Sequence, residues 1–553
     1  MRNSDLHRHA TIDHTKSRAI RSPISNDASR LRPKATTLAV LGYVALIPAL
    51  AHANCATSGA TTTCDTSAPS PWTTTIGTGP TTTSGAQVTV GSNAQIVVGN
   101  TSAIALSDNA NIVVGSGALV QNASTNTTGT YGTGGNTIDF RSNNTLTVEQ
   151  GATVLSNGTQ PTAEAVNPEG TGNTIVNNGT IRGVNSAAIW FQNTSGTNTV
   201  INNATGVIQA PNNVMGASGN GAVVFNNLGK VIGNLVFAGG NDTLNLFSGS
   251  SVSGTINGGG GSNLLTLNGT GSETLPTAIT GFQTLQKKDS GTWTITNSIG
   301  GMGVTSAEVQ QGTLVLTGTN TSYTGAMQVD SAGTLRASAQ SLPLAVTDNG
   351  LVQFQQDTAG TYTGLVSGSG AVEKDGVGTL TLAPSAAGGN TYTGGTVLKQ
   401  GVLSVSADSA LGGTPGGVTF DGGTLQLGSS FDLANTRAIS VTSNGGTIDT
   451  QGFQSTIDQT INGTGALDKT GSGTLTVNGA VVGSIAAEVQ QGTLVLNGDG
   501  SQFTGSVTVD QPAVLQASAQ SLPPTVTDNG LVQFEQGVDG VYNGTIGGTG
   551  VVE

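Results

Sequence analysis

Charged and aromatic side chains are scarce in this chain of 553 residues. Charged residues make up 9% of the sequence and aromatic residues 4%, whereas charged residues average about 25% of globular proteins. Disordered chains usually combine low hydrophobicity with high net charge, so the shortage of charge argues against disorder. Glycine is abundant instead, at 84 residues, and Val, Ile, Leu and Thr occur in every segment. The composition indicates an ordered β protein punctuated by glycine turns.

Histidine does not occur after residue 53, because all four histidines lie near the N-terminus, at His7, His9, His14 and His52. Basic residues are also few in residues 54–553, where ten Lys and Arg stand against 28 Asp and Glu, a formal net charge of −18. Such a surface repels nucleic acid and anionic lipid at long range. We therefore expect no nucleic-acid partner.

The N-terminal segment has the pattern of an export signal. Residues 1–34 are basic, and the apolar run 36–50 is followed by the small-x-small sequence Ala51-His52-Ala53. This order predicts a signal peptide over residues 1–53, cleaved between Ala53 and Asn54. The alternative, a transmembrane anchor, would need roughly 20 apolar residues.

Cysteine occurs only twice, at Cys55 and Cys64, directly after the predicted cleavage point. In an exported chain two such residues are expected to form a disulfide. A metal site would need further ligands that this segment lacks, and Asn54 replaces the small residue that a lipid anchor on Cys55 requires. We interpret residues 54–85 as an N-terminal cap segment with this Cys pair.

A ladder of Gly-x-Leu or Gly-x-Ile triplets runs through the C-terminal half with a nearly constant period. The triplets begin at Gly312, Gly333, Gly378, Gly401, Gly423 and Gly446, and continue less regularly at Gly473 and Gly492. In residues 86–280, Asn-Asn pairs recur with a similar period at Asn177, Asn202 and Asn226. The period is in the low twenties, which suits one turn built from three short strands and three turns.

These repeats predict an all-β fold, an elongated right-handed parallel β-helix (β-solenoid) with turns of about 20–25 residues. A single turn cannot bury its own apolar face, but stacked turns share a core and pair their backbones at about 4.8 Å spacing. Right-handed winding follows from the crossover rule for parallel strands. We place the N-terminal β-helix turns at residues 86–280 and a second set of repeats at 281–553.

A longer repeat lies over this ladder. Residues 307–373 match residues 487–553 without a gap. Glu373 is followed by Lys374 and a Gly-Thr-Leu strand, whereas its equivalent, Glu553, is the last residue. We therefore expect the gene product to continue beyond residue 553.

The segment from Gly368 to Leu403 resembles the autotransporter-associated β-strand repeat. The residues that carry the resemblance are Gly376, Gly378, Thr379, Leu380, Tyr392, Gly394, Gly401 and Leu403. Partial copies occur around Tyr323, Lys469 and Phe503, so the resemblance covers residues 281–553. It implies an autotransporter passenger exported by type V secretion, and an outer-membrane β-barrel translocator is expected beyond the end of this sequence.

Four groups of residues could carry chemistry, and each has a simpler structural interpretation. Asp289-Ser290-Gly291 lacks the histidine base of a protease triad, so a β-turn is favoured. The turn around Asp242 resembles half of a calcium site, but the next turn has no Asp. The carboxylates Glu164, Glu169, Asp357, Asp375 and Asp458 are scattered in sequence, and nothing pairs them at the separation of about 5–9 Å needed for glycan hydrolysis. Trp190-Phe191 could contact a sugar or a protein, but internal stacking is favoured.

The sequence therefore predicts a surface-exposed or released passenger without enzymatic activity, cofactor or metal, which mediates adhesion, autoaggregation or biofilm contact. Its expected partners are the translocator and the surface of a host or neighbouring cell. Two alternatives stay open: a β-helix stalk with a polysaccharide-acting enzyme activity, and a purely structural translocation scaffold.

Overall fold

The computed structural model describes residues 54–67, 71–125, 135–160, 162–276 and 278–553. The predicted signal peptide, with Ala51 and Ala53, lies outside these ranges. Within them the chain forms β-strands and three short 3₁₀ helices and has no α-helix; the 3₁₀ helices are η1 (Gly79–Thr81), η2 (Gly300–Met302) and η3 (Asp408–Leu411). No helix among the described residues has the length and apolar character needed to span a membrane.

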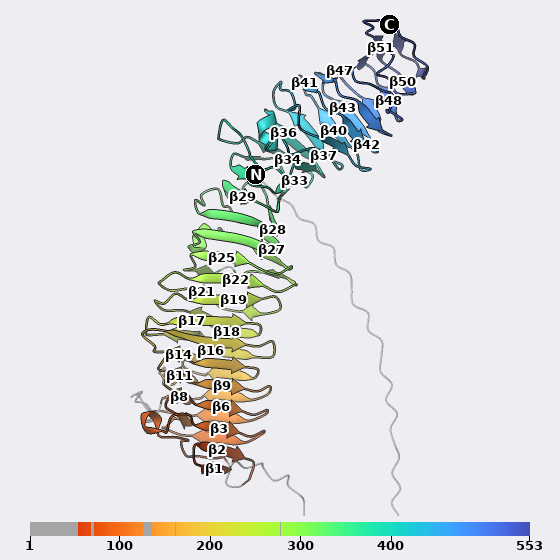
Figure 1. Ribbon diagram of the computed structural model, residues 1–553. Helices are drawn as coiled ribbons and strands as arrows, with labels where there is room; N and C mark the ends of the chain where they lie inside the picture. Colours follow the sequence, from red (N-terminus) through yellow and green to blue (C-terminus); the bar gives the residue numbers. More distant parts are fainter. Residues whose placement is uncertain (1–53, 68–70, 126–134, 161, 277) are drawn as a thin grey trace, which may run out of the picture. The chain divides into compact units, whose positions relative to one another are not determined.

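The strands stack as a parallel β-solenoid of about 22 turns with a spacing of about 21 residues. The strands β3 (Gln87–Val90), β6 (Asn111–Val114) and β9 (Thr145–Val148) show the pattern, because each pairs in parallel with the next, which lies above it in Figure 1. Their inward residues Val88, Ile112 and Leu146 are in register and buried. The all-β, parallel β-solenoid predicted from the repeats is confirmed.

Each of the N-terminal turns has three sides. In the first of them, β3 forms side one, β4 (Gln95–Val98) side two and β5 (Ile104–Ala105) side three. Side one continues through strands that pair in parallel: β12 (Thr174–Asn177), β15 (Thr197–Asn202), β17 (Ala222–Asn227), β19 (Thr243–Phe247), β22 (Leu264–Asn268) and β25 (Thr284–Lys287). The long strand β16 (Val207–Ala217) covers sides two and three of its turn, since it pairs with both β13 (Thr180–Gly183) and β14 (Ile189–Phe191).

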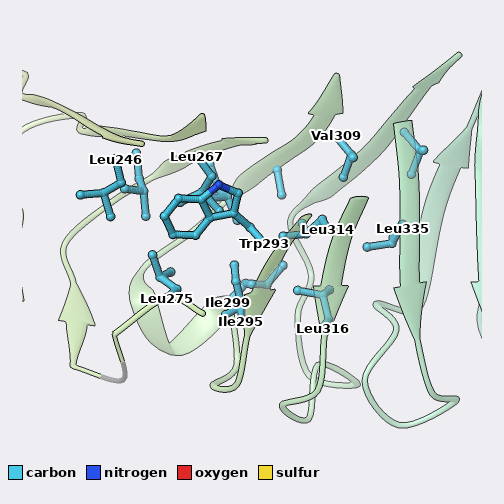
Figure 2. Close-up of a cluster of buried hydrophobic side chains, with 14 of the residues drawn as sticks. Leu246, Leu267, Leu275, Trp293, Ile295, Ile299, Val309, Leu314, Leu316 and Leu335 are labelled. Carbon is cyan, nitrogen blue, oxygen red and sulfur yellow. The ribbon is translucent and has the colours of Figure 1, made fainter. Parts of the chain in front are cut away.

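The core is a continuous row of apolar side chains inside the stack. Figure 2 shows how Trp293 lies among Leu246, Leu267 and Leu275, which come from neighbouring turns. The indole Nε1 donates a hydrogen bond to the carbonyl oxygen of Asn268 at 3.0 Å, so its polar atom is satisfied within the core. Burial of these side chains is the main favourable term in stacking one turn on the next.

The Gly-x-Leu triplets form ladders as expected, but on three different sides. Leu314 pairs with Leu335 on side two, Leu380 with Leu403 on side three, and Leu475 with Leu494 on side one. In the first copy of the long repeat the sequence AEVQQGTLVL lies within β27 (Ser306–Leu316), which covers sides one and two. In the second copy it lies on β46 (Ala486–Val489) and β47 (Thr493–Leu496), on sides three and one.

The two copies of the long repeat are therefore not separated by a whole number of turns. The stacked strands of side two show this. They continue from β33 (Ala371–Asp375) through β35 (Thr396–Leu398) and β37 (Val418–Phe420) to β39 (Ile439–Val441) without changing side. The two copies have the same local pairing, but equivalent strands of the two copies lie on different sides of the stack.

The first turn is capped by a hairpin. Strand β1 (Asn54–Ser58) runs antiparallel to β2 (Thr61–Asp65), and β2 then pairs in parallel with β3. Cys55 lies directly opposite Cys64, and the expected disulfide joins them. The hairpin covers backbone groups of β3 that would otherwise face solvent at the end of the stack.

Replacing both cysteines by serine is expected to loosen this cap. A loop of about ten residues closed by a disulfide contributes about 2–3 kcal/mol in the chain-entropy account. Hydrogen exchange should therefore become faster in β2 and β3 and stay unchanged in distant strands such as β38 (Thr424–Leu427). Unchanged protection of β2 would contradict a stabilising role for the disulfide. The matched control is a variant that lacks the neighbouring hydroxyl contact between Thr57 and Thr62 but keeps the disulfide.

Candidate functional site

Three lysines occupy inward positions of the strand ladders, where apolar residues normally lie. Lys287, Lys374 and Lys469 are 0%, 1% and 2% exposed. Their register neighbours in adjacent turns are Leu267 and Val309, Phe354 and Leu398, and Ile448 and Val489, respectively. Lysine is rarely buried unless its charge is compensated, so each position needs a local set of acceptors.

Backbone carbonyl groups supply those acceptors. Lys374 Nζ donates to the carbonyl oxygens of Asp375 at 2.9 Å, Gly376 at 2.7 Å and Gln400 at 2.9 Å. Lys469 repeats this geometry with Thr470, Gly471 and Gln491, at 2.9, 2.7 and 3.0 Å. Lys287 donates to Lys288, to Asp289 at 2.7 Å and to Gln311 at 3.0 Å. Two acceptors follow the lysine in its own turn and the third belongs to the next turn, so each ammonium group joins two turns.

We call each of these arrangements a lysine corner, defined by the lysine and its three carbonyl acceptors. In every lysine corner the third acceptor is a Gln followed by a Gly with positive φ, which is 70° at Gly312, 66° at Gly401 and 68° at Gly492. A Cβ atom on Gly401 would lie 2.4 Å from the carbonyl oxygen of Gly376. The glycines of the predicted repeat motif therefore let two turns approach closely at the corner.

Burial lowers the pKa of Lys287, Lys374 and Lys469 to about 8, while nearby carboxylates partly oppose that shift. Asp289, Asp375 with Asp357, and Asp449 are these carboxylates. The ammonium groups thus stay mainly protonated at neutral pH, with three N–H donors for three acceptors. Asp357 and Asp375, which look unrelated in sequence, both lie near Lys374.

The tyrosines of the repeat form a second recurring corner. Tyr392 OH lies 2.7 Å from Thr396 Oγ1, Tyr362 OH donates to the carbonyl oxygen of Pro343 at 2.7 Å, and Tyr323 OH donates to that of Ala326 at 2.8 Å. The glycine two residues later leaves room for the ring, because a Cβ on Gly325 would lie 2.5 Å from Tyr323 OH. Gly394 is an exception, because a Cβ there would lie 2.5 Å from backbone atoms of Gly370, and it is Gly412 that packs against the Tyr392 ring.

The remaining motif residues are structural as well. Thr379 and Leu380 lie on β34 (Thr379–Leu382) and pair with Val402 and Leu403 on β36 (Val402–Val405). A Cβ on Gly378 would lie 2.6 Å from backbone atoms of Thr358. Sequence reasoning found these residues by their spacing, but it missed the lysines, whose signal was the shared pattern Lys-x-x-x-Gly-Thr.

The calcium-like turn forms part of a polar ladder along the stack. Asp242 Oδ1 accepts a hydrogen bond from Val223 N–H at 2.6 Å, and Asp242 N–H donates to Asn263 Oδ1 at 2.8 Å. Asn144, Asn173 and Asn198 form the same kind of ladder in earlier turns. Among the described residues no group of three or more His, Cys, Asp or Glu side chains is arranged to hold a metal ion.

Two of the carboxylates that look scattered in sequence each lie near a third one, Asp139. Glu164 and Glu169 lie on either side of β11 (Val166–Pro168) and interact electrostatically with Asp139 on β8 (Ile138–Phe140). Each of the two lies near Asp139 because β8 and β11 are register neighbours on side three. Glu164 and Glu169 are thus related through Asp139 and not directly to each other.

Burial is the main cause of the high pKa values in this group. It raises the pKa of Asp139 to about 6, although Ser102 Oγ donates a hydrogen bond to that carboxylate. It raises the pKa of Glu164 to about 8 and of Glu169 to about 7, with a further contribution from the Asp139 charge. Asp139 and Glu164 are only 2% and 7% exposed, so a polymeric substrate cannot reach them, and their protonation acts on stability.

The expected internal stacking of Trp190-Phe191 is right for one ring only. Phe191 points into the core and is fully buried. Trp190 lies on the outer face of β14 and covers Gly216 in the next turn, where a Cβ would lie 2.4 Å from the indole ring. Adjacent residues of a strand face opposite sides, so the two rings could not both be internal.

Replacing Lys374 by Met is expected to destabilise the surrounding turns by about 2–4 kcal/mol, because three buried carbonyl oxygens lose their donor. Urea unfolding followed by hydrogen exchange in β33 and β36 measures the effect. Lys230→Met, at an exposed lysine, is the control and should change stability little. Equal stability of the Lys374→Met and wild-type chains would show that the lysine corner does not hold the turns together.

Acidification is expected to stabilise the turns around Asp139. These carboxyls have pKa values near 4 in the unfolded chain but about 6 to 8 in the folded chain. The folded state therefore holds protons that the unfolded state releases, and the free energy of unfolding falls as pH rises from about 4 to 8. Melting temperatures at pH 5 and pH 8 test this, and Glu164→Gln should reduce the difference whereas Glu535→Gln, at an exposed carboxylate, should not. A melting temperature that rises from pH 5 to pH 8 would refute the assignment.

A comparison with protein families matches the segments that supply the third acceptor of each lysine corner. The passenger-associated-transport-repeat family matches residues 311–337, 372–405 and 491–511. Each matched segment contains the Gln that supplies the third acceptor of a lysine corner: Gln311, Gln400 and Gln491. No curated protein and no solved structure matches the chain. The family implies export to the cell surface and a linked outer-membrane translocator domain, and the matched repeats together with the parallel β-solenoid fit an autotransporter passenger domain with repeats.

Proposed function

We propose that this passenger acts by contact at the cell surface, in adhesion, autoaggregation or biofilm formation. The charge of the outer surface supports this proposal most directly. Four of the ten basic residues after residue 53 are buried, namely the three lysines of the lysine corners and Arg437. Six of the 28 acidic residues are buried as well, so 22 acidic and six basic residues remain outside and the surface is strongly acidic.

Arg437 is the buried cation that lies outside the lysine corners. Its guanidinium group is fully buried and forms two hydrogen bonds of 2.8 and 2.9 Å with the carboxylate of Asp408. The remaining donors contact backbone carbonyl oxygens, including those of Gly416 at 2.6 Å and Gly412 at 3.0 Å. This group serves the interior and is unavailable to an outside partner.

The outer faces repeat polar side chains from turn to turn. Asn245 donates to Asn226 at 2.7 Å, and Gln516 donates to Gln533 at 2.8 Å, each across neighbouring turns. Repetition of such weak contact groups along one molecule supports avidity without a single tight pocket. Contact between surfaces is the activity that this arrangement suits.

The structural scaffold is the second candidate function. It is favoured by the three lysine corners, which join successive turns in the region of the transport repeats. The polysaccharide-acting alternative has less support, because the carboxylates of Asp139 and Glu164 are buried.

Cells that display this passenger should clump and adhere more than cells that display an unrelated β-solenoid on the same translocator. Clumping should increase with salt, because a Debye length of about 8 Å at physiological ionic strength screens repulsion between acidic surfaces. Sedimentation and adhesion assays measure both effects. N-terminal sequencing of the displayed chain should start at Asn54 if the signal peptide is removed as proposed. Surface display without clumping or adhesion would favour the scaffold.

A further inference from the structure

We propose that a groove on side three, between β21 (Ile256–Asn257), β24 (Ile279–Thr280) and η2, binds an uncharged glycan. This inference rests on the proposed contact function and names a ligand class for it. The groove has a volume of about 530 Å³ and is open to solvent. That volume lies within the range of roughly 300–1,000 Å³ typical of small-ligand sites.

The groove is built by a local change in the fold. Strands on side three shorten to two residues in β21 and β24, and the next turn has the 3₁₀ helix η2 in place of a strand. Small residues complete the hollow, since Ala278 and Gly301 lie where larger outward side chains would fill it. Behind the groove lie the inward side chains of Ile256, Ile279 and Met302, which are only 1%, 4% and 3% exposed and hold the surrounding backbone in place.

Glycines keep one end of the groove free of side chains. Gly258, Gly281 and Gly303 follow β21, β24 and η2 in three consecutive turns, and the last two have φ values of 79° and 90°. A Cβ on Gly258 would lie 2.3 Å from the carbonyl oxygen of Gly281. The corner is therefore closely packed, and no side chain can be added there without moving the backbone.

The groove also presents an unpaired strand edge. Among the described strands β24 pairs only with β21, through hydrogen bonds from Ile256 N–H to Ala278 O and from Gly258 N–H to Thr280 O, both 2.8 Å. Since alternate residues of a strand direct their backbone groups to opposite edges, the N–H and C=O of Ile279 face η2. One backbone donor and one backbone acceptor thus border the groove.

The lining suits hydroxyl groups. Thr255, Thr280 and Ser298 contribute hydroxyls, Asn257 contributes an amide, and none of the described residues that line the groove is charged. Hydroxyls and amides both donate and accept hydrogen bonds, as the hydroxyls of a sugar do. The exposed methyl group of Ala278 can contact the C–H face of a sugar ring, and the lining has no charged side chain to compensate an ionic ligand.

An extended peptide is the competing ligand, because it could pair with the free edge of β24. Strand addition gains its affinity from a run of backbone hydrogen bonds. Strand β24 has only two residues and is followed by Gly281 with positive φ, so it offers too short an edge. The groove favours the glycan.

Titration of the purified exported chain with cello-, malto- and N-acetylglucosamine oligosaccharides, followed by saturation-transfer NMR and calorimetry, tests the proposal. We expect binding to at least one series, weakened at least tenfold by Ala278→Trp, which fills the groove. Ala326→Trp places the same ring at another exposed outward alanine, at the start of β28 (Ala326–Ala337), and should leave binding unchanged. Circular dichroism melts of both variants check that they fold.

Three results would overturn the proposal: no binding to any of these series, binding that survives Ala278→Trp in a folded chain, or binding of extended peptides in place of oligosaccharides. The clumping assay separates these results from the proposed function. Clumping by the wild-type passenger without oligosaccharide binding keeps the contact function and removes the groove as its site. Loss of both oligosaccharide binding and clumping in Ala278→Trp, with Ala326→Trp unaffected, supports both.

Discussion

Each turn of this protein depends on its neighbours for backbone pairing and for burial of its apolar row. A turn has three short strands, too few residues for a core of its own, and its inward side chains are covered only when the next turn lies in register. The alignment of Val88 with Ile112 and Leu146 shows this constraint at the start of the stack. Every other feature, from the cap hairpin to the repeat corners, either preserves that register or ends the stack.

The lysine corners meet the constraint in an unusual way. A buried cation carries a large desolvation cost, yet the chain places three of its few lysines inside the stack. The cost is offset because each Nζ has three carbonyl acceptors, one of them in the next turn. An apolar residue at the same position would fill the space, but the three carbonyl oxygens, which belong to two adjacent turns, would lose their donor. The polar contact therefore adds direction to a core that otherwise depends on non-directional packing.

Much of this fold could be predicted from sequence, because its signals are local and periodic. The spacing of the Gly-x-Leu triplets predicts the pairs Leu380–Leu403 and Leu314–Leu335, and the recurring asparagines predict the ladder in which Asn177 pairs with Asn202. The change of side between repeats could not be predicted, because it depends on small differences in turn length that accumulate along the chain. Burial of Lys374 was missed because lysine is normally solvated, and the pattern Lys-x-x-x-Gly-Thr that it shares with Lys287 and Lys469 does not show that its acceptors are backbone carbonyl groups. The contact of Asp139 with Glu164 joins residues in different turns, and its detection required the register of β8 and β11.

The rotation of the duplicated block has a consequence for recognition. Identical outward residues, such as Glu308 and its equivalent Glu488, belong to different strand lines, on side one and side three. A partner that approaches along one direction meets one of the two equivalent patches, while the other remains accessible from elsewhere. Duplication by a whole number of turns would have put both copies in a single stripe; duplication by a fractional number places the same side chains on two sides of the stack.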